Sequence, residues 1–177
     1  EDTLQCPNFG QFNFANNWKD PTQLSGSSPD YYHTCSQWMS PPNTSFGFQY
    51  PRSGIACAGI YNYSNTAPGI GGEYIQNTLT DTLKSGVLYC VSFYVSPSNN
   101  FKLNCSSLGA YFSSTAISRT DSSILNFQPQ IQNPIGNHIL DTASWTLIQG
   151  TFTASGNELY MTIGNFYLIP DTIQNNF

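Results

Sequence analysis

Val87-Leu-Tyr-Cys-Val-Ser-Phe-Tyr-Val95 is the stretch that decides the fold class. Residues of two kinds alternate along it with a period of two, which is the period of a β-strand with one buried face. One face carries Val87, Tyr89, Val91, Phe93 and Val95, and the other carries Cys90, Ser92 and Tyr94. We therefore expect the first set to face a core and the second to face a wetter surface.

Short segments of the same kind occur on both sides of this stretch. They span residues 46–50, 55–61, 73–79, 108–112, 145–152 and 159–166. Turn residues separate them, and no amphipathic helix longer than a turn or two is visible. The pattern predicts an all-β chain, with one antiparallel jelly-roll β-sandwich domain over residues 1–177. Trp145 begins one of these segments, and we expect it in the core.

The first 45 residues are expected to be irregular and packed on the sandwich. Five prolines break any helix or long strand there, at positions 7, 21, 29, 41 and 42. A long stretch without regular structure is unusual unless it is functional or held in place. We expect a disulfide between Cys6 and Cys35 to hold this segment.

The cysteine count is odd. Of the remaining Cys57, Cys90 and Cys105, at least one is free or pairs with another chain, and their pairing stays open. No Cys-x-x-Cys pair or Cys/His cluster is present, so a zinc site is not expected. Disulfides point to an oxidising compartment, and we expect an exported, extracellular or cell-surface protein whose signal peptide has been removed.

Charged residues make up only 8% of the chain, and the net charge is −5. The five basic residues are scattered, at Lys19, Arg52, Lys84, Lys102 and Arg119. Nucleic acids and anionic membranes are therefore not expected as partners. No apolar run approaches the roughly 20 residues of a membrane-spanning helix. Such low charge fits an extracellular surface kept soluble by hydroxyls, amides and attached sugars.

Several stretches in order along the chain resemble the galactose-binding-like, carbohydrate-binding-module-like jelly-roll domains of exported surface proteins from Bacteroidota (the Cytophaga–Flavobacterium group). The matching stretches are Pro29-Asp-Tyr-Tyr32 with Cys35, Phe46-Gly-Phe-Gln49, Ala58-Gly-Ile60, Glu73-Tyr-Ile-Gln76, residues 83–95, residues 108–113 and residues 145–166. The resemblance implies a module of a surface or adhesive protein, for which carbohydrate binding is inferred from the fold.

Two features of that family are missing from this sequence. Its members tend to open with an Asn-Pro-x-Phe-Glu strand and to close with an Asp-Asp-Val strand. Their absence predicts open sheet edges, which are templates for pairing with another chain. The acidic residues that often bind structural calcium in this fold lie on those strands, so calcium is possible but unsupported. No other cofactor is expected.

Asp-Thr followed by a small or aliphatic residue occurs four times. This triplet resembles the O-glycosylation signal of Bacteroidota, and average composition would give about one copy or none. The resemblance implies glycans on Thr3, Thr82, Thr142 and Thr172. The alternative is that Asp and Thr are simply common at turns.

Catalytic residues are not expected. His33 lies near Asp30 and His138 near Asp141, but a loop His beside an Asp is usually a surface hydrogen bond. No Gly-x-Ser-x-Gly elbow, phosphate loop or dinucleotide fingerprint is present. We therefore do not expect an enzyme.

Aromatic residues outside the strand alternation are the candidates for binding. Flat rings can stack on sugar faces while polar side chains bond the hydroxyls. The candidate ligand-binding residues are Trp38, Tyr50, Arg52, Tyr61, Tyr63 and Glu73. The alternative is that loop aromatics pack the N-terminal segment onto the sandwich, which we favour for Trp18 and Tyr31.

Three hypotheses follow. The first is a non-catalytic extracellular module that adheres to cell-surface or environmental polysaccharide or self-assembles. The second is a glycosylated structural subunit of an extracellular filament, a homopolymer built by strand exchange between copies. The third is an enzyme, or the accessory domain of a secreted hydrolase.

Overall fold

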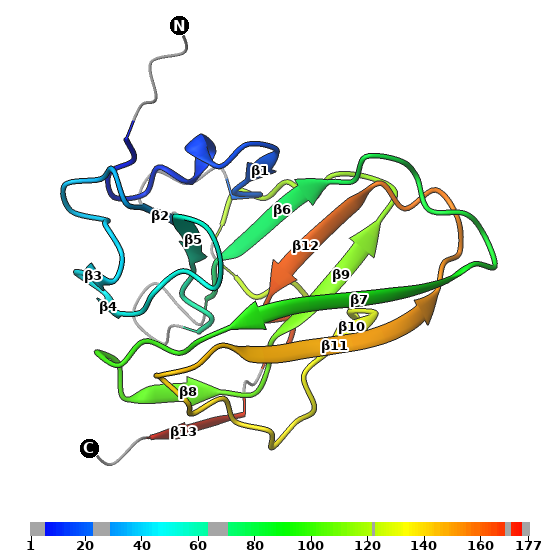
Figure 1. The fold of residues 1–177 in the computed structure, drawn as a ribbon. Helices are drawn as coiled ribbons and strands as arrows, with labels where there is room; N and C mark the ends of the chain where they lie inside the picture. The colour runs from blue at the N-terminus through cyan, green and yellow to red at the C-terminus, as the bar shows by residue number, and fades with distance from the viewer. Residues whose placement is uncertain (1–5, 23–28, 64–70, 122, 169–170, 175–177) are drawn as a thin grey trace, which may run out of the picture.

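The computed structural model describes residues 6–22, 29–63, 71–121, 123–168 and 171–174, and it is all-β (Figure 1). The described residues contain no α-helix, and every pairing between named strands is antiparallel. The elements of the first half are η1 (Phe12–Phe14), β1 (Trp18–Lys19), β2 (Asp30–His33), β3 (Asn43–Thr44), β4 (Gly47–Phe48), β5 (Ala56–Gly59) and β6 (Tyr74–Thr78). Those of the second half are β7 (Leu88–Val95), β8 (Leu103–Cys105), β9 (Gly109–Ser113), β10 (Ile131–Gln132), β11 (Thr146–Thr153), β12 (Tyr160–Gly164) and β13 (Thr172–Gln174).

The main layer is a five-stranded sheet in the order β1-β6-β12-β9-β10. Its register aligns Trp18, Asn77, Met161 and Phe112 across four strands, so these side chains share one face. Trp18 packs against the core from this row, as expected.

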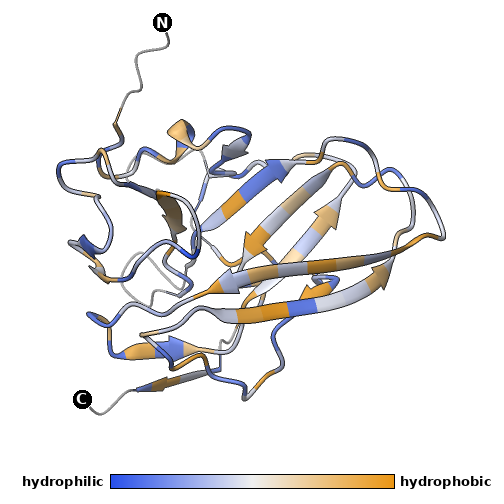
Figure 2. Ribbon diagram, viewed as in Figure 1, coloured by the Kyte–Doolittle hydropathy of each residue, from blue (hydrophilic) through white to orange (hydrophobic). Residues whose placement is uncertain are grey.

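The second layer is the two-stranded sheet β11-β7, whose eight residue pairs run from Thr146↔Val95 to Thr153↔Leu88. Tyr89, Val91, Phe93 and Val95 are half-buried while the residues between them are exposed, which confirms the predicted alternation; Val87 itself is exposed. Figure 2 shows hydrophobic residues on the facing strands of both layers.

The core lies between these two layers. Its buried residues are Leu108, Ala110, Phe112, Ile131, Ile139, Ile148 and Ile163. Phe112 and Phe152 meet with ring centroids 4.8 Å apart, which joins β9 of one layer to β11 of the other. A buried aromatic pair of this kind adds roughly 0.5–1.5 kcal/mol beyond the area it buries.

The opposite face of the five-stranded sheet is also covered, by the segment after β9. Arg119 lies over the Tyr74 ring, 4.6 Å from its centroid, and its Nη2 donates to the Gly72 carbonyl oxygen at 2.6 Å. Gln76 Nε2 donates to Thr162 Oγ1 at 3.0 Å within the same layer. Gln76 Nε2 and the Arg119 guanidinium have partners here, whereas Gln76 Oε1 is buried without a hydrogen-bond partner among the described residues.

The N-terminal segment departs in part from the expected irregular coil. The predicted Cys6–Cys35 disulfide is present. β1 joins the five-stranded sheet at its edge, and β2 pairs with β5. These strands are only two to four residues long, so no period-two pattern marks them in the sequence.

One expectation about the core was wrong. Trp145 is half-buried outside the core cluster, and its indole Nε1 donates to the Tyr50 carbonyl oxygen at 2.8 Å. A buried indole N–H needs a hydrogen-bond partner, and Trp145 has one in the Tyr50 carbonyl, just after the β3–β4 hairpin.

The sheet edges differ greatly in length. The five-stranded sheet ends in β1 and β10, each of two residues. The β11-β7 sheet instead has two eight-residue strands, and in the described part of the chain no third strand pairs with either. Long unpaired edges are the positions at which a sheet can accept a further strand.

Candidate functional site

The β3–β4 hairpin carries the candidate binding surface and is fixed to the end of the sandwich. Gln49 Nε2 donates to Ser96 Oγ at 2.8 Å and to the Thr142 carbonyl oxygen at 3.1 Å. Gly47 has φ +143°, and a Cβ there would lie 2.7 Å from Ser98 Oγ, so only glycine fits between the hairpin and the loop after β7.

A chain of edge-to-face aromatic contacts starts from this hairpin. Phe46 lies with its ring centroid 6.0 Å from Phe9 on one side and 6.0 Å from Tyr61 on the other. Tyr61 continues the chain to Phe101 at 5.6 Å. Four segments that are distant in the sequence thereby bring their rings together.

A second aromatic group lies at the other end of the same hairpin. The rings of Phe48 and Tyr50 meet edge to face at 5.5 Å. Two residues after Tyr50, Arg52 lies over the Tyr94 ring of β7, with its guanidinium carbon 3.9 Å from the centroid. Such a cation–π contact holds a hydrogen-bond donor next to exposed rings.

We call these rings the aromatic surface. Its members are Phe9, Phe46, Phe48, Tyr50, Tyr61 and Phe101. All but the half-buried Phe46 keep at least 41% of their surface exposed. Scattered single exposed aromatics are ordinary, whereas exposed rings that contact one another make this surface the candidate site.

Glu73 anchors Tyr61 in this surface. The Tyr61 amide donates to Glu73 Oε2 at 2.8 Å, and the Glu73 amide donates to the Tyr61 carbonyl oxygen at 2.7 Å. The pKa of the Tyr61 phenol is raised, mainly by desolvation and less by the negative charges of Glu73 and Asp30. The phenol therefore stays protonated and can donate a hydrogen bond.

Four of the six predicted binding residues lie at the aromatic surface, and two do not contact it. Tyr61 lies against Glu73, and Tyr50 and Arg52 lie at the second aromatic group. Trp38 is 56% exposed, and Tyr63 is half-buried; neither has an aromatic contact among the described residues. The sequence did not single out the other four members of the aromatic surface, which are Phe9, Phe46, Phe48 and Phe101.

The histidines have structural contacts. His33 is buried, and its Nδ1 accepts a hydrogen bond from the Cys35 amide at 3.1 Å. His138 Nε2 lies 3.2 Å from Asp171 Oδ2, not beside Asp141 as its sequence neighbourhood suggested. Ser106 Oγ donates to the same Asp171 oxygen at 2.9 Å. Ser106 and His138 thus both approach the carboxylate, so the histidine is not placed between serine and acid as in a catalytic triad.

Neither a metal site nor a membrane-spanning helix is found within the described ranges. No group of three His, Cys, Asp or Glu side chains is placed to hold a metal ion. No helix there is long and apolar enough to cross a bilayer.

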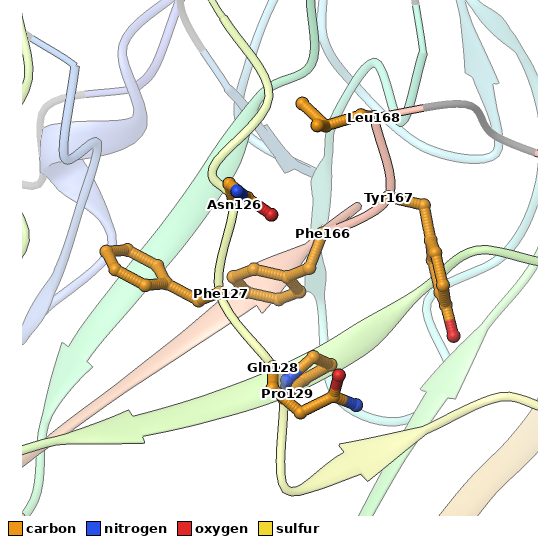
Figure 3. A pocket seen from close by; sticks show the side chains of 7 residues that line it. All are labelled: Asn126, Phe127, Gln128, Pro129, Phe166, Tyr167 and Leu168. Atoms are coloured by element: carbon orange, nitrogen blue, oxygen red, sulfur yellow. The ribbon is translucent and has the colours of Figure 1, made fainter.

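A shallow pocket of about 520 Å³ lies away from the aromatic surface, between residues 126–129 and 166–168 (Figure 3). Phe127 stacks on Tyr111 with centroids 4.7 Å apart and planes 5° apart. The amide side chains of Asn126 and Gln128 and the ring of Tyr167 complete the lining. The sequence did not predict this pocket.

The predicted glycosylation residues differ in accessibility. Thr82 is exposed in the loop after β6, whereas Thr142 is half-buried and Thr172 is half-buried within β13. Thr3 lies outside the described residues. Glycan attachment at all four stays a prediction.

The three remaining cysteines are unpaired within the described chain. Cys90 is exposed on β7. Burial raises the pKa of Cys57 to about 11 and also raises the pKa of Cys105. Cys57 and Cys105 are half-buried, so Cys90 is the most accessible thiol of the three.

Comparison with known proteins gives no further guide to this site, since no family model, curated protein or solved structure matches the chain.

Proposed function

We propose that this protein is a non-catalytic, extracellular surface module that binds polysaccharide through the aromatic surface. The observation that carries this proposal is the gathering of exposed rings from four separate segments around one hairpin, with Arg52 and Glu73 beside them. Rings of this kind cover the apolar faces of sugars, and the flanking polar groups bond hydroxyls.

The compartment and the fold family are part of the same proposal. The Cys6–Cys35 disulfide favours an oxidising environment outside the cytosol. The two antiparallel layers favour a jelly-roll sandwich of the galactose-binding-like type. A charged fraction of only 8% favours a surface solubilised by hydroxyls, amides and O-linked sugars.

Polysaccharide binding is tested first on a glycan array and then by affinity electrophoresis with the polysaccharide that the array identifies. We expect Tyr61→Ala and Tyr50→Ala each to weaken binding about tenfold, which corresponds to about 1.4 kcal/mol. Phe127→Ala is the matched control, because Phe127 is 40% exposed, as against 42% for Tyr61, but lines the other pocket. Equal binding by all three variants and the wild type would refute the role of the aromatic surface.

A second candidate function is that of a structural subunit of an extracellular filament. The long unpaired edges of the β11-β7 sheet favour it, because strand exchange between copies needs such an edge. Electron microscopy of native material at physiological salt tests it. Ordered filaments would support this function, and single compact particles would contradict it.

A further inference from the structure

The outer edge of β7 offers backbone groups that β11 does not use. The Ala154 amide donates to the Val87 carbonyl oxygen at 3.0 Å. These two residues extend the β7–β11 ladder by one pair beyond Thr153↔Leu88. Hydrogen-bonded pairs alternate along an antiparallel ladder, so the odd-numbered residues 89–95 bond to β11. The amides and carbonyls of Leu88, Cys90, Ser92 and Tyr94 therefore face away from it, along the outer edge.

An apolar groove of about 360 Å³ runs beside this edge. Its floor includes Leu79, Leu83 and Met161, all half-buried, and no charged residue is among those that line it. Cys90 and Ser92 of the β7 edge lie along its side. An open backbone edge and an apolar floor thus occur together, which is the arrangement that accepts an added β-strand.

The floor of the groove belongs to the five-stranded sheet. Leu79 directly follows β6 and Met161 lies on β12, so the five-stranded sheet continues beneath the open edge (Figure 1). A strand added beside β7 would therefore lie in the layer of β7 and β11 and over this floor.

We propose that the outer edge of β7 accepts one extended, uncharged segment of another polypeptide, which becomes the third strand of the β11-β7 sheet. Its backbone bonds the outward groups of Cys90, Ser92 and Tyr94. Its alternate side chains lie on the groove floor and are apolar, because the uncharged lining would leave a buried charge unpaired. The inference is independent of polysaccharide binding and supplies the contact that the filament candidate needs.

The test uses a fluorescein-labelled nonapeptide with valine and isoleucine at alternate positions, threonine and glutamine between them, and two lysines after the ninth residue for solubility. Binding is measured by fluorescence anisotropy on the intact protein. Amide hydrogen exchange, measured by NMR, reports the contact directly. We expect fast exchange at residues 90, 92 and 94 in the free protein and at least tenfold slower exchange with bound peptide.

Two proline variants form a matched pair, because Ser92 and Gln149 are direct partners in the ladder and direct their amides to opposite edges. Proline removes an amide without disturbing the β7–β11 hydrogen bonds at either position. Ser92→Pro should weaken peptide binding at least tenfold, whereas Gln149→Pro should stay within twofold of the wild type.

Two results would overturn the inference. One is peptide binding that leaves exchange at residues 90, 92 and 94 unchanged, or no peptide binding at all. The other is equal binding by Ser92→Pro and Gln149→Pro. If Ser92→Pro does not fold, amide hydrogen exchange at residues 90, 92 and 94 of the wild type still tests whether the peptide pairs with β7. Polysaccharide binding by the same variants is measured separately and should not change.

Discussion

Tyr61 and Glu73 are joined by two hydrogen bonds that connect the loop after β5 to the start of β6. Each amide donates to the other residue, at 2.8 Å to the Glu73 carboxylate and at 2.7 Å to the Tyr61 carbonyl. The position of an exposed ring in the aromatic surface therefore depends on a carboxylate that approaches its backbone.

Glu73→Gln should retain the acceptor but remove the charge. The pKa of the Tyr61 phenol is raised by desolvation and by negative neighbours, so this variant should lower that pKa toward its ordinary value of 10. NMR titration of ring-labelled tyrosine measures it. Glu73→Ala removes the acceptor as well and should weaken polysaccharide binding more than Glu73→Gln does; equal affinities would show that Glu73 does not position Tyr61.

The double substitution of Cys6 and Cys35 by serine should lower the free energy of unfolding by about 3 kcal/mol. The disulfide spans a sequence separation of 29, and removing it restores the entropy of that loop to the unfolded chain. Urea unfolding measures the loss. Cys90→Ser is the control and should stay within about 0.5 kcal/mol of the wild type, because Cys90 is exposed and unpaired.

Asp30 and Asp171 should affect stability in opposite directions. Burial raises the pKa of Asp30, so its stabilising contribution is present at low pH and is lost as pH rises through its folded pKa. The Ser106 hydroxyl, the Gly136 amide and the His138 side chain lower the pKa of Asp171, so its contribution is present above the unfolded value of 3.8 and is lost as pH falls through its folded pKa.

At about pH 7, Asp30→Asn should therefore be more stable than the wild type and Asp171→Asn less stable. The Asp30→Asn difference should shrink as the pH is lowered to about 3, because a carboxyl with a raised pKa is then protonated in both the folded and the unfolded state. The Asp171→Asn difference should begin to shrink only below the unfolded value of 3.8, as the pH falls toward the lowered folded pKa. Urea unfolding at the two pH values gives the comparison. If Asp30→Asn differed from the wild type by the same free energy of unfolding at both pH values, burial of the Asp30 carboxylate would not be the cause.

Glycan occupancy in the native protein should follow exposure. Thr82 lies in an exposed loop, whereas Thr172 is half-buried and paired with Cys105 in a strand. Mass spectrometry of intact glycopeptides should therefore find sugar at Thr82 and little or none at Thr172, and Asp81→Ala should abolish the Thr82 glycan. Full occupancy at Thr172 would mean that attachment precedes folding.

The longest strands are the ones that show most clearly in the sequence. β7 and β11 have eight residues each, and the alternation that predicted β7 is a local property of the chain. β1, β3 and β10 have two residues each, which is too short to show a period. β3 pairs locally with β4 in a hairpin, whereas β1 and β10 are strands because they pair with β6 and β9, which lie far along the chain.

The sequence by itself determined the all-β class, the buried face of β7 and the Cys6–Cys35 disulfide, because alternation and cysteine position are local features. Only the tertiary structure decided that Phe9, Phe46, Tyr61 and Phe101 meet, and that Trp145 lies at the rim. It also decided that the open edge of β7 lies beside an apolar groove. These relationships depend on long-range packing, in which an aromatic residue can pack inside or remain exposed with the same local sequence around it.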